Sequence, residues 1–516
     1  PVYLKQIATV TDGPASPANY VSMGFGKGAE KGAKNPSEYP AVTLSVSKVK
    51  GADAMMISEQ LLEKVESLKK TLIPNDVHVE VTRNYGETAS HKVSELLLHL
   101  GVAIVAVTIL VMLAMGWRGG LVVFLSVPLT FALTLFSYYM LGYTLNRITL
   151  FALVFVVGIV VDDSIIIAEN MHRHFHMKKL PFKQAAIYAI NEVGNPTILA
   201  TFTVIAAILP MAFVSGMMGP YMSPMPIGAS IAMLLSLFVA LTVTPYLGYH
   251  LLKVKDEKEH QEEQGLETGL IYKWYKKIEQ PFLDSSKKRW VMLGITGVLL
   301  VISMLAFFTK WVAVKMLPFD NKNEIQVVID MPEGTTLEKT SVVAKEVSQY
   351  LRTVPEVVNY QNYVGSSSPI TFNGLVRHYD MRGASNTADI QVNLLNKSER
   401  SKQSHDVAKT IRPEIQKIAK KFGANIKIVE VPPGPPVLST IVAEVYGPDY
   451  DEQIRIADEV QKILINTEDV VDVDWMVEAP QGEFKIIPDK EKSMLNGIAP
   501  QQLVGNLNYL LGEYPV

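Results

Sequence analysis

Residues 158–170 read GIVVDDSIIIAEN, and two adjacent acids, Asp162 and Asp163, lie inside this otherwise apolar run. A helix that crosses a bilayer needs about 20 mostly apolar residues. An aspartate near the middle of such a helix costs about 2.5 to 3.5 kcal/mol on insertion scales, so a pair without a role would be strongly disfavoured. Ionisable residues at membrane depth usually serve transport or proton transfer, and we expect the same of this pair.

The two carboxyl groups are expected to titrate as one coupled unit. Removal from water disfavours the charged form of a carboxyl group, and a neighbouring carboxylate adds repulsion. The pair could therefore exchange a proton near neutral pH, and its charged and neutral forms would favour different helix arrangements. A basic partner should face the pair, yet the apolar segments contain no interior Lys or Arg. We expect that partner in sequence outside this chain or in another subunit.

Six segments are long and apolar enough to cross a membrane as helices. They cover residues 96–115, 121–141, 148–170, 197–214, 225–250 and 291–308. Buried helices of a soluble core are the alternative, but so many apolar runs exceed what a chain of 516 residues could cover. Charged residues make up only 19% of the chain, against about a quarter in soluble domains, which also favours a membrane protein.

Basic residues predict how these segments are oriented. The connection 172–183 is rich in Lys, Arg and His, whereas 215–220 has no charge, so the first is expected in the cytoplasm and the second outside. Residues 251–290 are again charged and contain an expected amphipathic helix on the inner membrane surface. Its apolar side carries Leu270, Ile271, Trp274, Tyr275 and Ile278. The regions before 96 and after 308 then lie on the outer side.

The outer regions alternate strands with helices. Expected strands are 324–331, 357–364, 388–395 and 425–431, with helices at 335–351 and 404–421. This order is typical of a split βαβ, or ferredoxin-like, unit. A second unit is expected to have strands at 440–446, 470–477 and 482–487 and a helix at 450–465. The amino-terminal part has expected strands at 41–49 and 77–81 and a helix at 54–71.

Three aromatic residues, Tyr360, Tyr363 and Phe372, flank a loop at 365–369 in the first of these outer units. They could line a cleft that binds amphiphilic ligands through apolar area. They could equally fill the core of the sheet.

Several classes of function are excluded or disfavoured. The net charge of −3, without a basic stripe, gives no sign of a nucleic-acid partner. Zero cysteines exclude disulfides and thiolate metal sites. We find no nucleophile, nucleotide or metal motif, so we expect a transporter that is not an enzyme and has no cofactor. Four methionines suggest soft-metal ligands, but such residues more often pack against lipid or helices. They are Met217, Met218, Met222 and Met225.

The run 157–170 resembles the fourth-helix motif of resistance-nodulation-division (RND) efflux transporters. Supporting motifs are Pro210-Met211-Ala212-Phe213, Thr244-Pro245, Leu317-Pro318-Phe319-Asp320 and Pro332-Glu333-Gly334-Thr335. Because the chain opens with Pro1 and ends within an outer region, we expect an internal piece of a longer protein.

The resemblance implies a domain order. Residues 1–90 would end a first periplasmic porter region, 91–250 hold helices two to six, and 251–290 form the cytoplasmic loop. Residues 291–310 would be helix seven, and 311–434 and 435–516 two porter subdomains, the second running toward the docking region.

The resemblance also implies the activity. It predicts a homotrimer in the bacterial inner membrane that exports amphiphilic small molecules or drugs in exchange for protons. A periplasmic adaptor and an outer-membrane channel would be its partners, and Asp162 and Asp163 its proton relay. Heavy-metal cation export, or a non-pumping module that handles lipids or proteins, are the alternatives.

Overall fold

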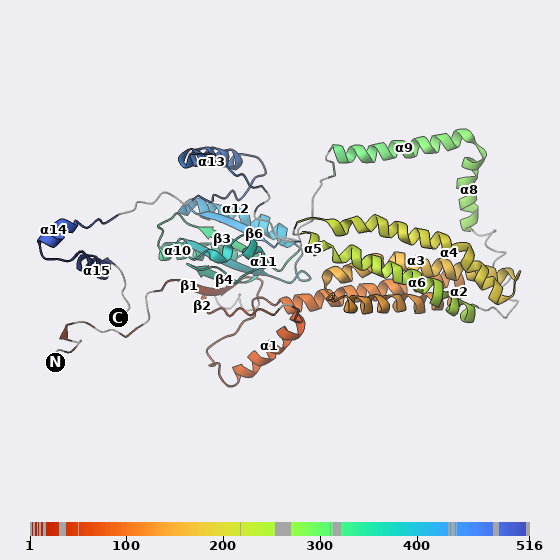
Figure 1. Cartoon of the computed structure of the whole chain (residues 1–516), viewed down its shortest axis with the longest axis horizontal. Coiled ribbons are helices and arrows are strands. Elements are labelled where there is room, and N and C mark those ends of the chain that lie inside the picture. Colours follow the sequence, from red (N-terminus) through yellow and green to blue (C-terminus); the bar gives the residue numbers. More distant parts are fainter. Residues whose placement is uncertain are drawn as a thin grey trace.

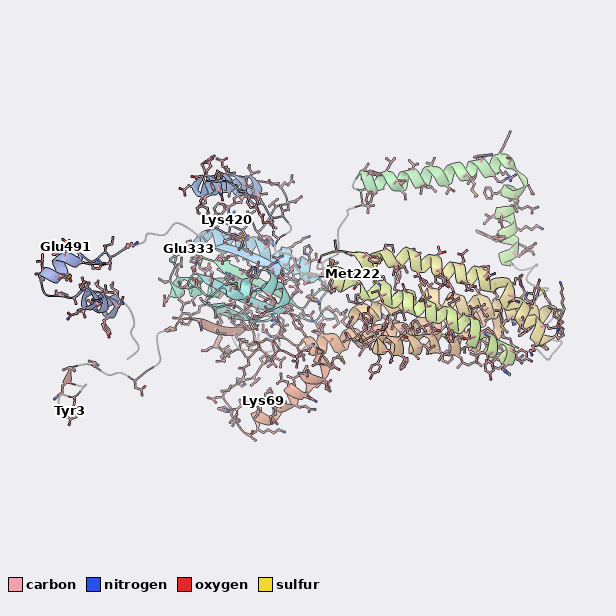
Figure 2. All side chains as sticks on the ribbon, in the orientation of Figure 1. Tyr3, Lys69, Met222, Glu333, Lys420 and Glu491 are labelled. Atoms are coloured by element: carbon pink, nitrogen blue, oxygen red, sulfur yellow. The ribbon has the colours of Figure 1, made fainter. Side chains whose placement is uncertain are left out.

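The computed structural model combines a bundle of long helices with a six-stranded sheet (Figure 1). It describes residues 17–29, 38–49, 51–216, 218–252, 270–309, 321–431, 441–477 and 485–511, with isolated positions between these ranges. The sheet lies beyond one end of the bundle, and Met222 marks that end (Figure 2).

Five helices among the described residues are long and apolar enough to cross a membrane. They are α2 (Tyr85–Met140), α3 (Arg147–Met177), α4 (Phe182–Ile208), α6 (Pro224–Leu251) and α9 (Ser286–Phe308). The first four pack together around a shared apolar core that includes Val122, Val156, Ala189 and Met233. Helix α9 stands apart from this bundle, and none of its residues is buried (Figure 1).

The expected number of six spans differs from these five because α2 contains two of the expected segments. Helix α2 has 56 residues, and its backbone leaves the helical conformation at Gly116, where φ is 78° and ψ is 171°. A Cβ atom placed on Gly120 would lie 3.2 Å from the carbonyl oxygen of Thr108. Residues so far apart along a straight helix would not touch, so α2 folds back on itself at Gly116.

Short elements complete this part of the chain. They are η2 (Leu209–Phe213), α5 (Met218–Met222) and α8 (Leu270–Asp284). Helix α8 is the helix expected at the inner membrane surface, and it packs against α9. The side chains of Leu270 and Ile271 lie outside the described part.

The sheet is antiparallel with the strand order β2-β1-β4-β5-β3-β6, and it lies in the regions expected on the outer side of the membrane. Its strands are β1 (Tyr20–Phe25), β2 (Tyr39–Pro40), β3 (Glu324–Asp330), β4 (Val357–Val364), β5 (Thr387–Leu394) and β6 (Asn425–Glu430). Helices α10 (Leu337–Leu351) and α12 (Ser404–Phe422) pack on one face of the sheet. The segment between β4 and β5 contains α11 (Phe372–Val376) and η5 (Tyr379–Met381). Strands β3 to β6 and both large helices lie close to the bounds expected from the sequence.

Several other expected strands are wrong. Residues 41–49, 77–81, 441–446 and 471–476 are described but are not strands, nor is the described end of 482–487. Alternating apolar residues predict an extended chain, but a strand also needs a continuous ladder of hydrogen bonds to a neighbour. Among the described residues these segments have no such ladder, and 41–49 makes a single backbone bond to β1, from the Ala41 nitrogen to the Val21 carbonyl oxygen at 3.0 Å. For 470–477 a second cause is visible, because Asp472 within it and Asp469 just before it have left-handed backbones with φ of 54° and 65°.

The expected helices in these regions are present. They are α1 (Ala54–Lys69) and α13 (Tyr450–Ile465), followed by two helices that were not expected, α14 (Lys490–Leu495) and α15 (Pro500–Leu511). The side chain of Asp53 caps α1 through the backbone nitrogen of Met55, and Asp449 caps α13 through that of Glu452.

Candidate functional site: a carboxyl group inside the helix bundle

Asp163 lies in the interior of the bundle, with 7% of its surface exposed. Its helix α3 is fixed at the start by Asn146, whose side chain accepts hydrogen bonds from the backbone nitrogens of Ile148 and Thr149. The face of α3 that carries Val156, Val160 and Asp163 is buried in the bundle, where α3 packs against α2, α4 and α6.

Two hydroxyl groups from different helices contact the Asp163 carboxyl group. Ser236 of α6 places its Oγ 2.9 Å from Oδ2, and Thr201 of α4 places its Oγ1 3.4 Å from Oδ1. No ion pair to Asp163 is found among the described residues. A neutral hydroxyl shell around a carboxyl group satisfies its oxygens without neutralising its charge.

Each of these hydroxyl groups also has a backbone acceptor within reach. Ser236 Oγ lies 2.7 Å from the Val160 carbonyl oxygen, and Thr201 Oγ1 lies 2.9 Å from that of Thr197. A hydroxyl group has one proton, so it donates to one acceptor at a time. It can donate to Asp163 when the acid is ionised. When the acid is neutral and donates instead, Ser236 can donate to the backbone of α3 and Thr201 to the backbone of its own helix α4. The site therefore satisfies both protonation states of Asp163.

A second layer of hydroxyl groups lies next to this site. Thr244 Oγ1 of α6 is 3.1 Å from Ser126 Oγ of α2 and 3.4 Å from Ser164 Oγ of α3. All three side chains are buried. The polar interior around Asp163 thus joins α2, α3, α4 and α6 through small side chains that allow close helix packing.

Asp162 has different surroundings from Asp163. It is exposed on the side of α3 that no described helix covers, because neighbouring residues on a helix point about 100° apart. No hydrogen bond or ion pair to Asp162 is found in the described ranges. The two acids are neighbours in the chain, but among the described residues only Asp163 has side-chain hydrogen-bond partners. Coupled titration of the pair therefore stays a prediction.

One polar cluster ties α3 to α4 at the opposite end of the bundle from α5. Glu192 of α4 accepts from Asn170 at 3.1 Å and from Arg173 at 3.0 Å, and lies 2.7 Å from Nε2 of His174. Asn170 also donates to the Ala189 carbonyl oxygen at 2.8 Å. Asn170 ends the motif that contains the two acids, so the motif includes a contact that fixes α3 against its neighbour.

The outer aromatic residues do not line one open surface in this structure. Tyr360 is 1% exposed and belongs to the core between the sheet and its helices, and its hydroxyl group donates to Glu38 at 3.2 Å. Tyr363 is three positions along β4, on the opposite face, where its hydroxyl group lies 3.0 Å from Thr43 Oγ1. Phe372 begins α11, and its side chain lies outside the described part. The burial of Tyr360 favours a role in packing the core of the sheet unit. Contact of the three residues with cargo stays a prediction.

The face of the sheet away from α10 and α12 holds a charged network that the sequence did not reveal. Arg382 pairs with Asp330 and Asp389, and Lys427 pairs with Asp330 at 3.0 Å. Gln326 donates to Asp389 at 3.0 Å. The sequence did contain a signal for this network, which is the alternation of polar with apolar residues in β3, β5 and β6. Polar side chains that are buried on one face of a sheet need partners on that face.

Comparison with known proteins agrees with this combination of long apolar helices and a small antiparallel sheet. A family model described as the AcrB/AcrD/AcrF family matches residues 1–514. The chain belongs to the AcrB/AcrD/AcrF family. The match to this family confirms the resemblance to RND multidrug efflux proteins, which are membrane proteins.

Individual relatives share 23% to 30% of their residues with this chain over the matched lengths. The chain is 23% identical over 522 residues to the multidrug resistance protein MdtC of Photorhabdus laumondii, covering 99% of this chain and 46% of the relative. MdtC of Citrobacter koseri is 24% identical over 525 residues, covering 99% and 47%. MdtC of Pantoea ananatis is 30% identical over 300 residues, covering 57% and 28%. The chain thus spans less than half the length of these relatives.

Proposed function

We propose that this chain is part of a pump that exports amphiphilic small molecules in exchange for protons. Membership of the efflux family and relatives named as multidrug resistance proteins support the export of drug-like compounds. The proposal of proton coupling rests on one observation, the burial of Asp163 among hydroxyl groups of two other helices.

In the proposed mechanism, Asp162 and Asp163 take up protons from the outer side and release them to the cytoplasm. An ionised Asp163 draws the hydroxyl groups of Ser236 and Thr201 toward it, which strengthens the contacts of α3 with α6 and α4. Proton uptake removes the charge and weakens these contacts. The relative stability of two helix arrangements then depends on protonation, and this dependence couples the proton gradient to export.

The proposed topology follows from the fold-back of α2. Its two halves cross the membrane separately, which with α3, α4, α6 and α9 makes six crossings. The proposed boundaries are 91–250 and 291–310 for the spans, with 251–290 in the cytoplasm. Residues 1–90, 311–434 and 435–516 are proposed as periplasmic porter regions, the second with a ferredoxin-like order of strands.

The full-length protein is proposed to work as a homotrimer in the bacterial inner membrane, with a periplasmic adaptor and an outer-membrane channel. Family membership supports this assembly. Heavy-metal export is the weaker alternative, since the relatives are named for multidrug resistance. Met225 is buried in the bundle, which favours packing over metal binding, and Met217 lies outside the described residues.

Export by the full-length protein tests the proposal. We expect Asp162→Asn and Asp163→Asn each to abolish export of amphiphilic dyes from cells, with the protein still present in the membrane. Glu169→Gln is the matched control, because Glu169 is an exposed acid on the same helix. Undiminished export by both aspartate variants would remove the relay, and absence of any export by the parent would favour a non-pumping module.

A further inference from the structure

A line of alternating charges crosses the helix-free face of the outer sheet. It runs from Asp389 of β5 through Arg382 and Asp330 of β3 to Lys427 of β6, and ends at Asp474. Lys427 and Asp389 both pair in register with Val328, so they occupy one row of the sheet. The last member, Asp474, lies beyond the sheet in the region that contains α13.

The segment 471–474 contacts both sides of the edge strand β6. Asp474 pairs with Lys427 at 2.6 Å on the helix-free face. Asp472 pairs with Arg412 of α12, the helix on the other face. Because β6 ends the strand order, these two pairs hold the segment beside an otherwise open edge of the sheet.

We propose that residues 471–474 are a releasable ionic latch, which docks the outer unit 441–477 on the sheet unit 321–431 through the pairs Asp472–Arg412 and Asp474–Lys427. The latch goes beyond the proposed export function, because it concerns how two outer units open and close relative to each other. It would operate whatever the cargo and whatever drives the pump.

The burial of the partners determines which link opens. The Lys427 side chain is 7% exposed and that of Asp474 is 54% exposed. Breaking a pair usually leaves a buried charge without a partner, which is strongly unfavourable. Lys427 avoids this because it keeps Asp330 at 3.0 Å after Asp474 departs. The Asp474 carboxylate returns to water, so the outer link can open without leaving an unpaired buried charge.

The inner links of the line are expected to stay closed. The Asp389 side chain is 1% exposed and is held by Arg382, Gln326 and the backbone nitrogen of Ser368. Burial alone would raise the pKa of Asp330, but the adjacent Arg382 and Lys427 outweigh burial and hold that pKa below its ordinary value of 3.8. Burial alone would lower the pKa of Lys427, but Asp330 and Asp474 raise it above 10.5. Asp330 and Lys427 therefore stay charged near neutral pH. The contact in this line that opens and closes is the ion pair of Asp474 with Lys427.

Distances between spin labels on the two units test the latch. The sequence has no cysteine, so Lys420→Cys on α12 and Ile463→Cys on α13 place labels at two exposed positions. In the full-length protein without cargo, we expect one dominant distance. Asp472→Asn with Asp474→Asn should lower the ratio of docked to open molecules about five-fold, as loss of two partly exposed ion pairs would. High salt should shift the parent in the same direction.

Two further variants keep the test specific. Asp458→Asn removes an exposed ion pair with Lys462 within α13, so it should leave the distance unchanged. Exchanging the charges, as Arg412→Asp with Asp472→Arg, should restore docking that either single change loses. Unaltered distances in the Asp472→Asn, Asp474→Asn protein, with an unchanged circular dichroism spectrum, would overturn the latch. This outcome is independent of export, so it is distinguishable from failure of the proposed function.

Discussion

At the scale of single residues, Ser236 has the most direct influence on Asp163. Its hydroxyl group lies between the carboxyl oxygen at 2.9 Å and the Val160 carbonyl oxygen at 2.7 Å, on the neighbouring helix. The sequence predicts the acids, because charges in an apolar run stand out. It does not predict this partner, which is 73 positions away in a helix where serine is not unusual.

We expect Ser236→Ala to reduce export about ten-fold or more and to change how export depends on external pH. The ionised carboxyl group would lose a hydrogen bond, and a bond to a charged group contributes about 1.5 to 3 kcal/mol. Export at a series of external pH values measures this effect. Ser230→Ala is the control, because Ser230 is also buried in α6 but donates within its own helix, to the Pro226 carbonyl oxygen. Equal pH profiles for both variants would contradict a role for Ser236 in proton exchange.

At the scale of elements, α2 shows what apolar length can and cannot predict. Its composition correctly indicates two apolar segments, but the reversal between them depends on a single backbone conformation at Gly116. That combination of φ and ψ is essentially restricted to glycine, and other residues there cost about 1 to 3 kcal/mol.

Gly116→Ala is therefore expected to destabilise the fold-back of α2 and to lower the melting temperature of the purified protein by about one to three degrees. The space around the residue is open, so the effect would come from the backbone and not from a clash. Gly101→Ala provides the comparison, since Gly101 is helical and exposed in the same element. A melting temperature that is the same for Gly116→Ala and Gly101→Ala would mean that the conformation at Gly116 is not required.

The outer strands show a different limit of sequence analysis. Strands β3, β4, β5 and β6 are predicted well because their alternating apolar residues face helices of the same unit. Strand β1 was not expected, although Ser22 and Gly24 alternate with apolar residues as in a strand. Gly24 is required there, since a Cβ atom at that position would collide with the Tyr360 ring. Pairing between distant segments determines which extended stretches become strands, and no local pattern reports it.

At the scale of the whole molecule, charged contacts attach the sheet unit to the start of α2. Glu324 of β3 accepts from Arg83 Nε at 3.0 Å and from the Tyr85 hydroxyl group at 2.8 Å. Lys397, after β5, pairs with Glu95 of α2 at 3.3 Å. These contacts link the position of the sheet to that of the first turns of α2. Among the described residues, the start of α2 thus connects the bundle that holds Asp163 to the sheet (Figure 1).

Infrared spectroscopy of the full-length protein in membranes tests the central claim, that Asp163 binds and releases a proton inside the bundle. A protonated carboxyl group in apolar surroundings gives a carbonyl band separate from that of the carboxylate. We expect this band to grow as the pH falls through the physiological range, and to be absent in Asp163→Asn. A difference spectrum that is the same in the parent and in Asp163→Asn would contradict the account.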